Sequence, residues 1–553
     1  MLSLRSSSTL SMGSLKLMRR FLPPAAAVAA LTFATSGSAA TLFVTKGKGW
    51  GHGVGLSQWG AYGMARDGKT WRKIITHYFH GTDVGERRDT VRVLLGDRRS
   101  SVHIGSQEPF KVGQRTHGAG DPLVKPTSSG RIKVEGFRRS FSSPVKFRPL
   151  DAPLRLNGSP YHGKLIVSVV GDRLRVVNAV GLDDYVKGVV THESPAWWGD
   201  VGAFAALKAQ AVAARSYALS GPGHCVGGTY CPDTRDQVYG PISSETANGR
   251  AAVRSTAHKV VLDGSRVART FFFSSSGGRT ASSADVWGGV FSYLRSEDDP
   301  GDLKSFGSGA TNPNRSWRVL FKPKELGSKL GTPSPRNAVV TDRGSGRVRG
   351  LRVSGPGWSQ TFSELAEFFR IELALKSSRF WMGVQSIRAD EREVACNGAV
   401  KLFVFAHDVG SISVEQRRGT SSTWTRIRLN RVDAKHWRAT RHPCVSTSYR
   451  VKSAQAVGPT IRVRVSPDVA FNAVQHGDAL TGRVNPAPAG TSVTVERLTR
   501  GGWVAVGTAT VDSDGTFRAP FAVNEGAYRA RVVPQASSGL APGYGPVLHV
   551  VTP

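Results

Sequence analysis

Residues 182–219 read LDDYVKGVVTHESPAWWGDVGAFAALKAQAVAARSYAL, and the interpretation of the rest of the chain depends on this stretch. In its first part, apolar side chains recur at the three- and four-residue spacing of one helix face: Leu182, Tyr185, Val186, Val189 and Val190. Proline disfavours helical geometry in the residue before it. Because Pro195 follows, the sequence predicts that this helix ends near Thr191.

A second helix is predicted over residues 203–219, where alanine is frequent. Asp200 is placed to cap its N-terminus, and Gly221 with Pro222 ends it. Loop residues held by rigid elements often carry catalysis. The predicted turn between the two helices holds three polar side chains: His192, Glu193 and Ser194.

Glu193 is the leading candidate for a catalytic acid. A glutamate on a turn is often merely solvated, but here Pro195, Trp197 and Trp198 follow at once. Apolar surroundings raise the pKa of a carboxyl group toward the range in which it donates a proton at neutral pH. The sequence therefore favours an acid in a half-apolar setting.

Several long motifs resemble the core of the SpoIID/LytB (stage II sporulation protein D) family, over roughly residues 41–390. The resemblance implies a peptidoglycan lytic transglycosylase, with Glu193 as the catalytic acid and base. Ser194 stands where the family usually has methionine. The motifs are DYVKGVVTHESPAWW (184–198), ALKAQAVAARSYAL (206–219), DQVYG (236–240), FFFSSSGGRTASSADVWGG (271–289), YLRSEDDP (293–300) and GKGWGHGVGLSQWGAYGMA (47–65).

Three functions remain open. A lytic transglycosylase needs one carboxyl group, because the 6-hydroxyl of the muramic acid unit attacks its own anomeric carbon and leaves a 1,6-anhydro end. A hydrolase needs a second carboxylate, for which Asp285 is the candidate. The LytB resemblance also implies a noncatalytic protein that binds glycan and enhances a cell-wall amidase.

Four further residues are candidate sugar or transition-state contacts, although a packing role is equally open for each. Gln210 and Arg215 lie among small residues on the second predicted helix, and Ser275 lies in a serine- and glycine-rich loop. His52 lies in the glycine-rich block 47–65. No metal is expected to take part in the reaction.

The glycine-rich block has two interpretations. Trp50 and Trp59 flank polar groups there, as in sugar sites, where aromatic faces meet a few placed hydrogen-bonding groups. A structural glycine-rich turn is the alternative. A nucleotide site is rejected, because no GK[ST] follows. The block precedes the glutamate turn, so we expect a permuted order in which it still packs beside the site.

The chain begins like an exported protein. Basic residues within the first twenty positions precede an apolar run at 21–33, and SGSAA offers a cleavage site near Ala40. The run is short for a membrane span. We therefore expect a signal peptide over residues 1–40, with an uncleaved anchor as the alternative, and a mature protein that is secreted or held at the cell wall.

The formal net charge of +34 predicts a polyanionic partner. Nucleic acid is the common partner of a basic chain, but an exported protein meets little of it, so no nucleic-acid partner is expected. Anionic cell-wall polymers fit better, beside the peptidoglycan glycan strands themselves.

Four cysteines in an exported chain suggest disulfides. Cys225 with Cys231 would close a small loop, and Cys396 with Cys444 a larger one. Zinc bound by His224, Cys225 and Cys231 is a second possibility for the first pair, and free thiols are a third.

The expected fold class is α+β, with a mixed SpoIID-like domain over residues 41–390. Runs of β-branched residues predict β structure over 89–180 within it. Alternating apolar and polar residues then predict two all-β, immunoglobulin-like sandwiches at 391–469 and 470–553. Each module either binds the wall or acts as a spacer.

Overall fold

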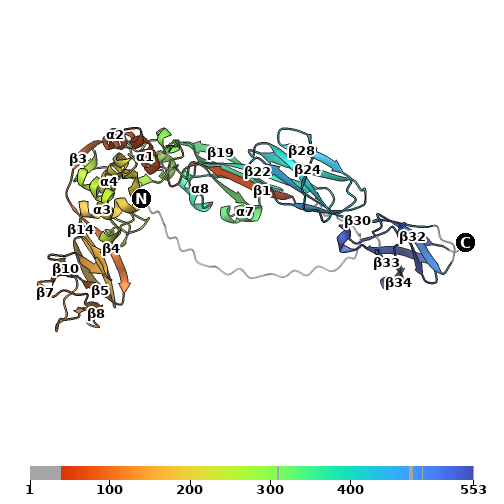
Figure 1. Cartoon of the computed structure of the whole chain (residues 1–553), viewed down its shortest axis with the longest axis horizontal. Coiled ribbons are helices and arrows are strands. Elements are labelled where there is room, and N and C mark those ends of the chain that lie inside the picture. Colours follow the sequence, from red (N-terminus) through yellow and green to blue (C-terminus); the bar gives the residue numbers. More distant parts are fainter. Residues whose placement is uncertain (1–38, 308–310, 473–476, 489, 552–553) are drawn as a thin grey trace, which may run out of the picture.

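The computed structural model describes residues 39–307, 311–472, 477–488 and 490–551. These residues form an elongated molecule, with the helices and an all-β unit at one end and the C-terminal sheets at the other (Figure 1). Except for its last two residues, the expected signal peptide at 1–40 lies outside the described residues. No helix in the described ranges is long and apolar enough to cross a membrane.

The helical region is built around α4 (Phe204–Leu219). Its alanines are buried almost without exception, and their small side chains let neighbouring helices approach closely. Four helices contact it: α1 (Gln58–Arg66), α2 (Trp71–Tyr78), α3 (Leu182–Glu193) and α5 (Ala247–Ser255). The predicted apolar face of α3 is buried in the same core.

The ends of the two central helices differ from the prediction. Helix α3 continues through Glu193, and only Ser194 leaves helical geometry, with φ −135° and ψ 138°. Proline restricts the single residue before it, so the helix runs two residues beyond Thr191. Asp200 does not cap α4; it follows a short 3₁₀ turn (Ala196–Gly199) and accepts a 2.7 Å hydrogen bond from Nδ2 of Asn248.

Two short strands join the glycine-rich block to the serine-rich loop. Strand β2 (Leu56–Ser57) pairs in parallel with β17 (Phe272–Phe273). The amide of Trp50 also donates a 2.8 Å hydrogen bond to the carbonyl of Ser275, which returns one to Trp50. The block therefore packs beside the serine-rich loop, although it lies far earlier in the sequence. A small sheet of β3 (Asp83–Glu86), β15 (Lys259–Asp263) and β16 (Arg266–Val267) borders the helices.

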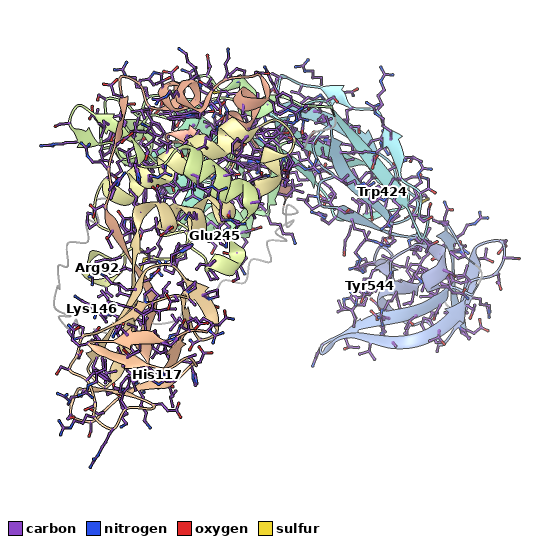
Figure 2. All side chains as sticks on the ribbon, turned by 60° about the vertical axis from the view of Figure 1, so that its left-hand side comes forward. Arg92, His117, Lys146, Glu245, Trp424 and Tyr544 are labelled. Carbon is purple, nitrogen blue, oxygen red and sulfur yellow. A yellow bond between two sulfur atoms is a disulfide. The ribbon has the colours of Figure 1, made fainter. Side chains whose placement is uncertain are left out.

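An all-β unit is inserted between α2 and α3, as the sequence predicted for 89–180, and it has its own buried core. It projects from the helices, with Arg92, Lys146 and His117 along it (Figure 2). One sheet has the order β4 (Thr90–Arg99), β14 (Arg173–Gly181), β13 (Lys164–Val170), β10 (Val145–Pro149), β6 (Phe110–Val112) and β7 (Arg115–His117). The other has β12 (Ser159–Tyr161), β11 (Leu154–Leu156), β5 (Val102–Gly105), β8 (Leu123–Pro126) and β9 (Ile132–Val134). Strand β14 runs directly into α3, so this unit sets the direction in which α3 starts.

A six-stranded sheet connects the middle of the chain with the C-terminal half. Its order is β18 (Trp317–Phe321), β1 (Ala40–Gly47), β22 (Phe380–Ala389), β24 (Val400–His407), β28 (His436–Arg441) and β27 (Asn430–Arg431). The sheet continues across the boundary expected between residues 390 and 391. A second sheet, β19 (Asn337–Gly344), β20 (Arg347–Gly355) and β21 (Trp358–Ser363), packs nearby with α7 (Pro323–Leu330) and α8 (Ala366–Glu372).

Short helices lie in the remaining loops of the first 390 residues: α6 (Ser283–Trp287) and the 3₁₀ turns η2 (Val226–Gly228), η3 (Ile242–Ser244) and η4 (Pro300–Leu303). The α+β character is therefore clear, because packed helices and several sheets share this part of the chain.

The C-terminal part consists of strands in further sheets. One contains β23 (Glu393–Ala395), β30 (Ile461–Ser466), β29 (Thr447–Ser453), β25 (Ile412–Arg418) and β26 (Thr425–Ile427). The last module has β31 (Asp468–Phe471), β32 (Ala479–Asn485) and β35 (Thr516–Pro520) facing β34 (Gly502–Thr510), β33 (Ser492–Thr499), β36 (Gly526–Val533), β37 (Gly543–Tyr544) and β38 (Leu548–Val550). Cys396 and Cys444 form a disulfide in the first of these regions. The immunoglobulin-like identity of the modules stays a prediction.

Candidate active site

A cavity of about 320 Å³ opens where α3 ends. Three segments that are distant in sequence supply its walls: the start of α1, the end of α3 with the following turn, and the loop after β17. Two larger hollows border Trp437 on the C-terminal sheets, and Glu193 lines neither of them. The side chains around the α3 cavity are Gln58, Trp59, Thr191, His192, Glu193, Ser194, Pro195, Trp198 and Ser274.

Glu193 is the carboxylic acid of this cavity. It is half-buried, and the backbone amide of Val238, in the DQVYG motif, donates a 2.9 Å hydrogen bond to its Oε1. Burial raises the pKa of the Glu193 carboxyl above its ordinary value. The hydrogen bonds from Val238 and from the Gln58 side chain lower it, but burial outweighs them. The group is thus anchored on one side and biased toward its protonated form.

Gln58, at the start of α1, connects Glu193 with Gln210. Its Nε2 donates to Oε1 of Gln210 at 3.5 Å, a long hydrogen bond. Gln210 is 1% exposed and does not line the cavity, so it reaches the site only through Gln58. The sequence analysis singled out Gln210 and missed Gln58, which is the residue that touches the acid.

Trp59 and Trp198 form an aromatic wall. Their ring centroids are 5.3 Å apart in an edge-to-face arrangement. Trp198 is fully buried, whereas Trp59 is half-buried. The amide of Trp59 donates to the carbonyl of Ser274 at 3.0 Å, which fixes the wall to the serine-rich loop.

The serine-rich loop presents a different serine from the one expected. Ser274 lines the cavity, while Ser275 is completely buried and donates from Oγ to Oδ2 of Asp302 at 2.9 Å. Ser274 and Ser275 are neighbours in the loop after β17, and Asp302 holds the hydroxyl of the second on the buried side. Of the two serines, the structure therefore places Ser274 at the cavity in place of the expected Ser275.

Asp302 organises the loop from beneath. Besides Ser275, its carboxylate accepts hydrogen bonds from the Ser57 hydroxyl and from the amides of Ser276 and Gly277, at 3.2, 3.2 and 2.9 Å. Burial, with repulsion from the neighbouring Asp299, raises the pKa of Asp302 to about 6. The sequence analysis did not single out this carboxylate, which lies just beyond the YLRSEDDP motif.

Arg215 is a structural cation and does not line the cavity. Its guanidinium has no exposure, and Nε lies 2.5 Å from Oδ1 of Asp183. The other nitrogens donate to backbone carbonyls, among them that of Val253 at 3.1 Å. The expected sugar contact is corrected, because every direction of the guanidinium is taken up inside the helical core.

His52 also lies away from the cavity. Its ring packs against Trp287 and Phe273, with centroids 5.0 and 5.4 Å apart, and its Nδ1 accepts a 3.1 Å hydrogen bond from the amide of Val54. Burial, reinforced by the positive charge of Arg347, lowers the pKa of His52 to about 3. The neutral imidazole packs within the glycine-rich block and does not line the α3 cavity.

Asp285, the second carboxylate of the hydrolase interpretation, is engaged elsewhere. Its oxygens accept hydrogen bonds from the hydroxyls of Ser282 and Ser345, and Oδ1 pairs with Arg349 at 3.0 Å. Although burial opposes the effect, these hydrogen bonds and the arginine lower the pKa of Asp285. It is not among the side chains that line the cavity.

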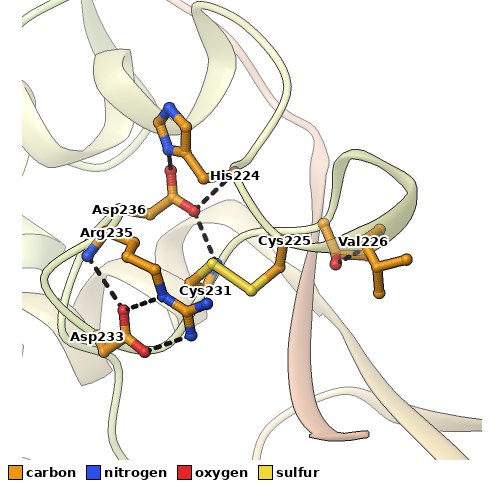
Figure 3. The surroundings of a disulfide bond; sticks show 8 residues. His224, Cys225, Val226, Cys231, Asp233, Arg235 and Asp236 are labelled. Atoms are coloured by element: carbon orange, nitrogen blue, oxygen red, sulfur yellow. Dashed lines mark hydrogen bonds and ion pairs between the residues drawn. A yellow bond between two sulfur atoms is a disulfide. The ribbon is translucent and has the colours of Figure 1, made fainter. Parts of the chain in front are cut away.

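Cys225 and Cys231 form a disulfide in the loop after α4 (Figure 3). Asp236 organises this loop: Oδ2 accepts from the amides of His224 and Cys231 at 2.9 and 2.8 Å, and Oδ1 lies 2.5 Å from Nδ1 of His224. Sulfurs bonded to each other do not bind zinc. Within the described ranges, no three His, Cys, Asp or Glu side chains are grouped so as to hold a metal ion.

Comparisons with known proteins identify relatives of the part of the chain that holds α3 and α4. The family model described as "Stage II sporulation protein" (SpoIID) matches residues 170–262, which include α3, α4 and the Cys225–Cys231 loop. An uncharacterized protein of Brachyspira hyodysenteriae is 36% identical over 287 residues, which cover 48% of this chain and 73% of that protein. The chain belongs to the SpoIID family.

Two relatives from Bacillus subtilis match shorter parts. The amidase enhancer is 33% identical over 171 residues, which cover 30% of this chain and 21% of that protein. Stage II sporulation protein D is 50% identical over 46 residues, which cover 8% of this chain and 13% of that protein. In this SpoIID family member, two walls of the α3 cavity come from outside residues 170–262: the start of α1 and the loop after β17.

Proposed function

We propose that this protein is a peptidoglycan lytic transglycosylase that cleaves the bond between N-acetylmuramic acid and N-acetylglucosamine with Glu193 as the only acid and base. Membership of the SpoIID family and the position of Glu193 in a cavity with an aromatic wall support the proposal. The protein would act outside the cytoplasm on glycan strands. Its two disulfides and its net charge of +34 support export and a position among anionic wall polymers.

The reaction needs two proton transfers at Glu193, which donates one proton and then receives another. The neutral carboxyl donates the proton to the glycosidic oxygen while the bond from that oxygen to the muramic C1 breaks. The resulting carboxylate takes a proton from the muramic 6-hydroxyl as its oxygen forms the new bond to C1. The products are a 1,6-anhydro end and a free hydroxyl on the leaving sugar, and no water is consumed.

The raised pKa of the half-buried Glu193 carboxyl carries this proposal, because the acid must be neutral before it is charged. The Val238 amide fixes Oε1 and stabilises the charged form when it appears. Among the side chains that line the cavity, Glu193 is the sole carboxylate. One carboxylate suits intramolecular attack by the 6-hydroxyl, whereas ordinary hydrolysis uses two.

Digestion of purified glycan strands, followed by mass spectrometry of the products, tests the proposal. The wild-type protein should release ends that are one water lighter than reducing ends. Glu193→Gln should lower the rate by at least about 100-fold, as loss of a general acid does, while its circular dichroism stays unchanged. Asp285→Asn should keep the anhydro product. Reducing ends, together with loss of activity in Asp285→Asn, would establish the hydrolase instead.

A second candidate is a noncatalytic protein that binds glycan and enhances a cell-wall amidase. The relative named amidase enhancer favours it. Glu193→Gln separates the two candidates. A noncatalytic protein would release no anhydro ends, and the variant would stimulate a cell-wall amidase as well as the wild type does.

A further inference from the structure

Two arginine side chains on neighbouring segments have buried nitrogens without a hydrogen-bond partner in the described part of the chain. Arg347, the first residue of β20, has no exposed surface, and Nε, Nη1 and Nη2 have no hydrogen-bond partner among the described residues. Arg379, just before β22, is half-buried, and its Nε and Nη1 likewise lack a partner there. Buried guanidinium groups are almost always paired, so this pair requires an explanation.

The two arginines belong to one cluster. The amide of Val348 donates a 2.9 Å hydrogen bond to the carbonyl of Ser378, which places the residues beside them next to each other. The charge of Arg379 adds to burial in lowering the pKa of Arg347 to about 10. The Ser378 hydroxyl is also buried without a partner in the described part of the chain.

The glycine-rich block covers Arg347 and is shaped to do so. A Cβ atom on Gly53 would lie 1.9 Å from Nη2 of Arg347, and Gly53 has φ +91°, which favours glycine. A larger residue at this point would strain the backbone and would require the Arg347 guanidinium to move. The block that the sequence analysis associated with sugar therefore encloses a cation.

The two carboxylates whose charges act on Arg347 are committed to other groups. Glu367 accepts hydrogen bonds from Nε of Arg370 at 2.9 and 3.0 Å. Among the described residues, the carboxylate of Asp302 accepts from serine hydroxyls and backbone amides alone. Both act on Arg347 through space, but neither forms a hydrogen bond with it in the described structure. Two like charges that are buried without a bound counterion strongly destabilise a fold.

We propose that Arg347, Arg379 and Ser378 form a binding site for a phosphate group. Together they offer six buried donor atoms that are unpaired among the described residues. Guanidinium groups match phosphate geometry through paired N–H donors, and the several oxygens of phosphate can use more of these donors than the two of a carboxylate. None of the three residues lines the Glu193 cavity, so the inference does not depend on the proposed function.

Calorimetric titration of the full chain with inorganic phosphate tests the site, at fixed pH and with ionic strength held constant by chloride. We expect one phosphate per chain. Its binding should raise the melting temperature by about 2 °C or more relative to chloride, as a ligand that binds only the folded state does. Equal melting temperatures in phosphate and chloride would overturn the proposal. So would an equal shift produced by acetate, because a planar carboxylate would then suffice.

Substitutions localise the effect. Arg347→Met and Arg379→Met should each abolish the phosphate-dependent shift, and Arg347→Met should be at least as stable as the wild type in chloride, because an uncompensated charge is gone. Arg388, which stacks over Phe403 at 3.9 Å, provides a matched control: Arg388→Met should keep the shift. If Arg347→Met fails to fold, Arg379→Met decides alone. Retention of the full shift in Arg379→Met would overturn the proposal.

A second ligand identifies the source of the phosphate. If glycerol 1-phosphate competes with inorganic phosphate, the site accepts a phosphate ester. The glycerol part of the ester would then extend toward the surface beside the half-buried Arg379. Failure to compete, when inorganic phosphate binds, would assign the site to free phosphate. Either result supports recognition of a phosphate group by the two arginines.

Discussion

The hydroxyl of Ser57 donates a 3.2 Å hydrogen bond to Oδ1 of Asp302, across 245 positions of sequence. Ser57 also caps α1, accepting a 3.2 Å hydrogen bond from the amide of Gly60. Because Gln58 follows Ser57 and Ser274 precedes the loop amides that Asp302 binds, a single buried carboxylate aligns two walls of the Glu193 cavity. The positions of these two cavity walls thus depend on Asp302, which does not itself line the cavity.

Asp302→Asn tests this arrangement through stability. Folding raises the pKa of Asp302 to about 6 from an unfolded value near 3.9. The folded state then binds the proton more tightly, so the free energy of unfolding falls as pH rises from about 4 to about 6. The asparagine variant should show a flatter fall in this window. At neutral pH it should be less stable by about 1–3 kcal/mol, because its amide would direct a donor at a buried N–H.

Urea unfolding followed by tryptophan fluorescence at several pH values measures both effects. Ser265, on the turn between β15 and β16, serves as an exposed control, and Ser265→Ala should match the wild type. If Asp302→Asn and the wild type show the same dependence on pH between 4 and 6, the carboxylate does not titrate in this window.

Gln58→Leu should move the pH dependence of catalysis. The hydrogen bond from the Gln58 side chain lowers the pKa of Glu193, so its removal raises that pKa further. A general acid loses activity as pH rises through its pKa. The alkaline limb of the kcat/KM profile should therefore shift to higher pH, even though the maximum rate falls. Gln114→Leu, in the inserted β unit, should leave the profile in place, and a shift to lower pH in Gln58→Leu would contradict the assignment of Glu193.

The sequence predicted the parts of the site that depend on local pattern. The apolar spacing from Leu182 to Val190 identified α3, and the alanine-rich run identified α4. Pro195 predicted the end of α3 to within two residues. The prediction was two residues short because proline restricts only the residue before it, Ser194. The proximity of the glycine-rich block to the site was also predicted, and the β2–β17 pairing explains it.

The missed residues depend on tertiary contacts that no local pattern encodes. In the sequence, Asp302 has the pattern of a surface acid in a charged segment. The folded structure buries it beneath the serine-rich loop. Ser275 is turned away from the cavity by its hydrogen bond to Asp302, which lies 27 positions later in the sequence. Arg215 and His52 are polar residues among small ones. A buried polar residue that forms its hydrogen bonds within the protein gives the same sequence pattern as a residue that contacts a ligand.

Arg215→Lys should separate a structural role from a substrate-binding one. Lysine keeps the charge but cannot pair with Asp183 and also reach the carbonyl of Val253. We expect a loss of stability of about 3 kcal/mol, in the range found when a buried ion pair is broken, with KM for glycan strands unchanged at a temperature where the variant is folded. Urea unfolding and steady-state kinetics provide the two readings. If the variant were as stable as the wild type and its KM rose tenfold, Arg215 would be a substrate contact.

Trp59→Ala should weaken glycan binding, because Trp59 is the half-buried face of the aromatic wall beside Glu193. Loss of one aromatic contact of this kind costs about 1–1.5 kcal/mol, which corresponds to an increase in Kd of roughly tenfold. Trp50 is a matched control from the same block: its side chain is 50% exposed and does not line the cavity. Titration of glycan strands into the inactive Glu193→Gln background measures binding without turnover. Trp50→Ala should bind like the parent in that assay, and equal weakening by both substitutions would mean that the glycan crosses the outer face of the block instead of entering the α3 cavity.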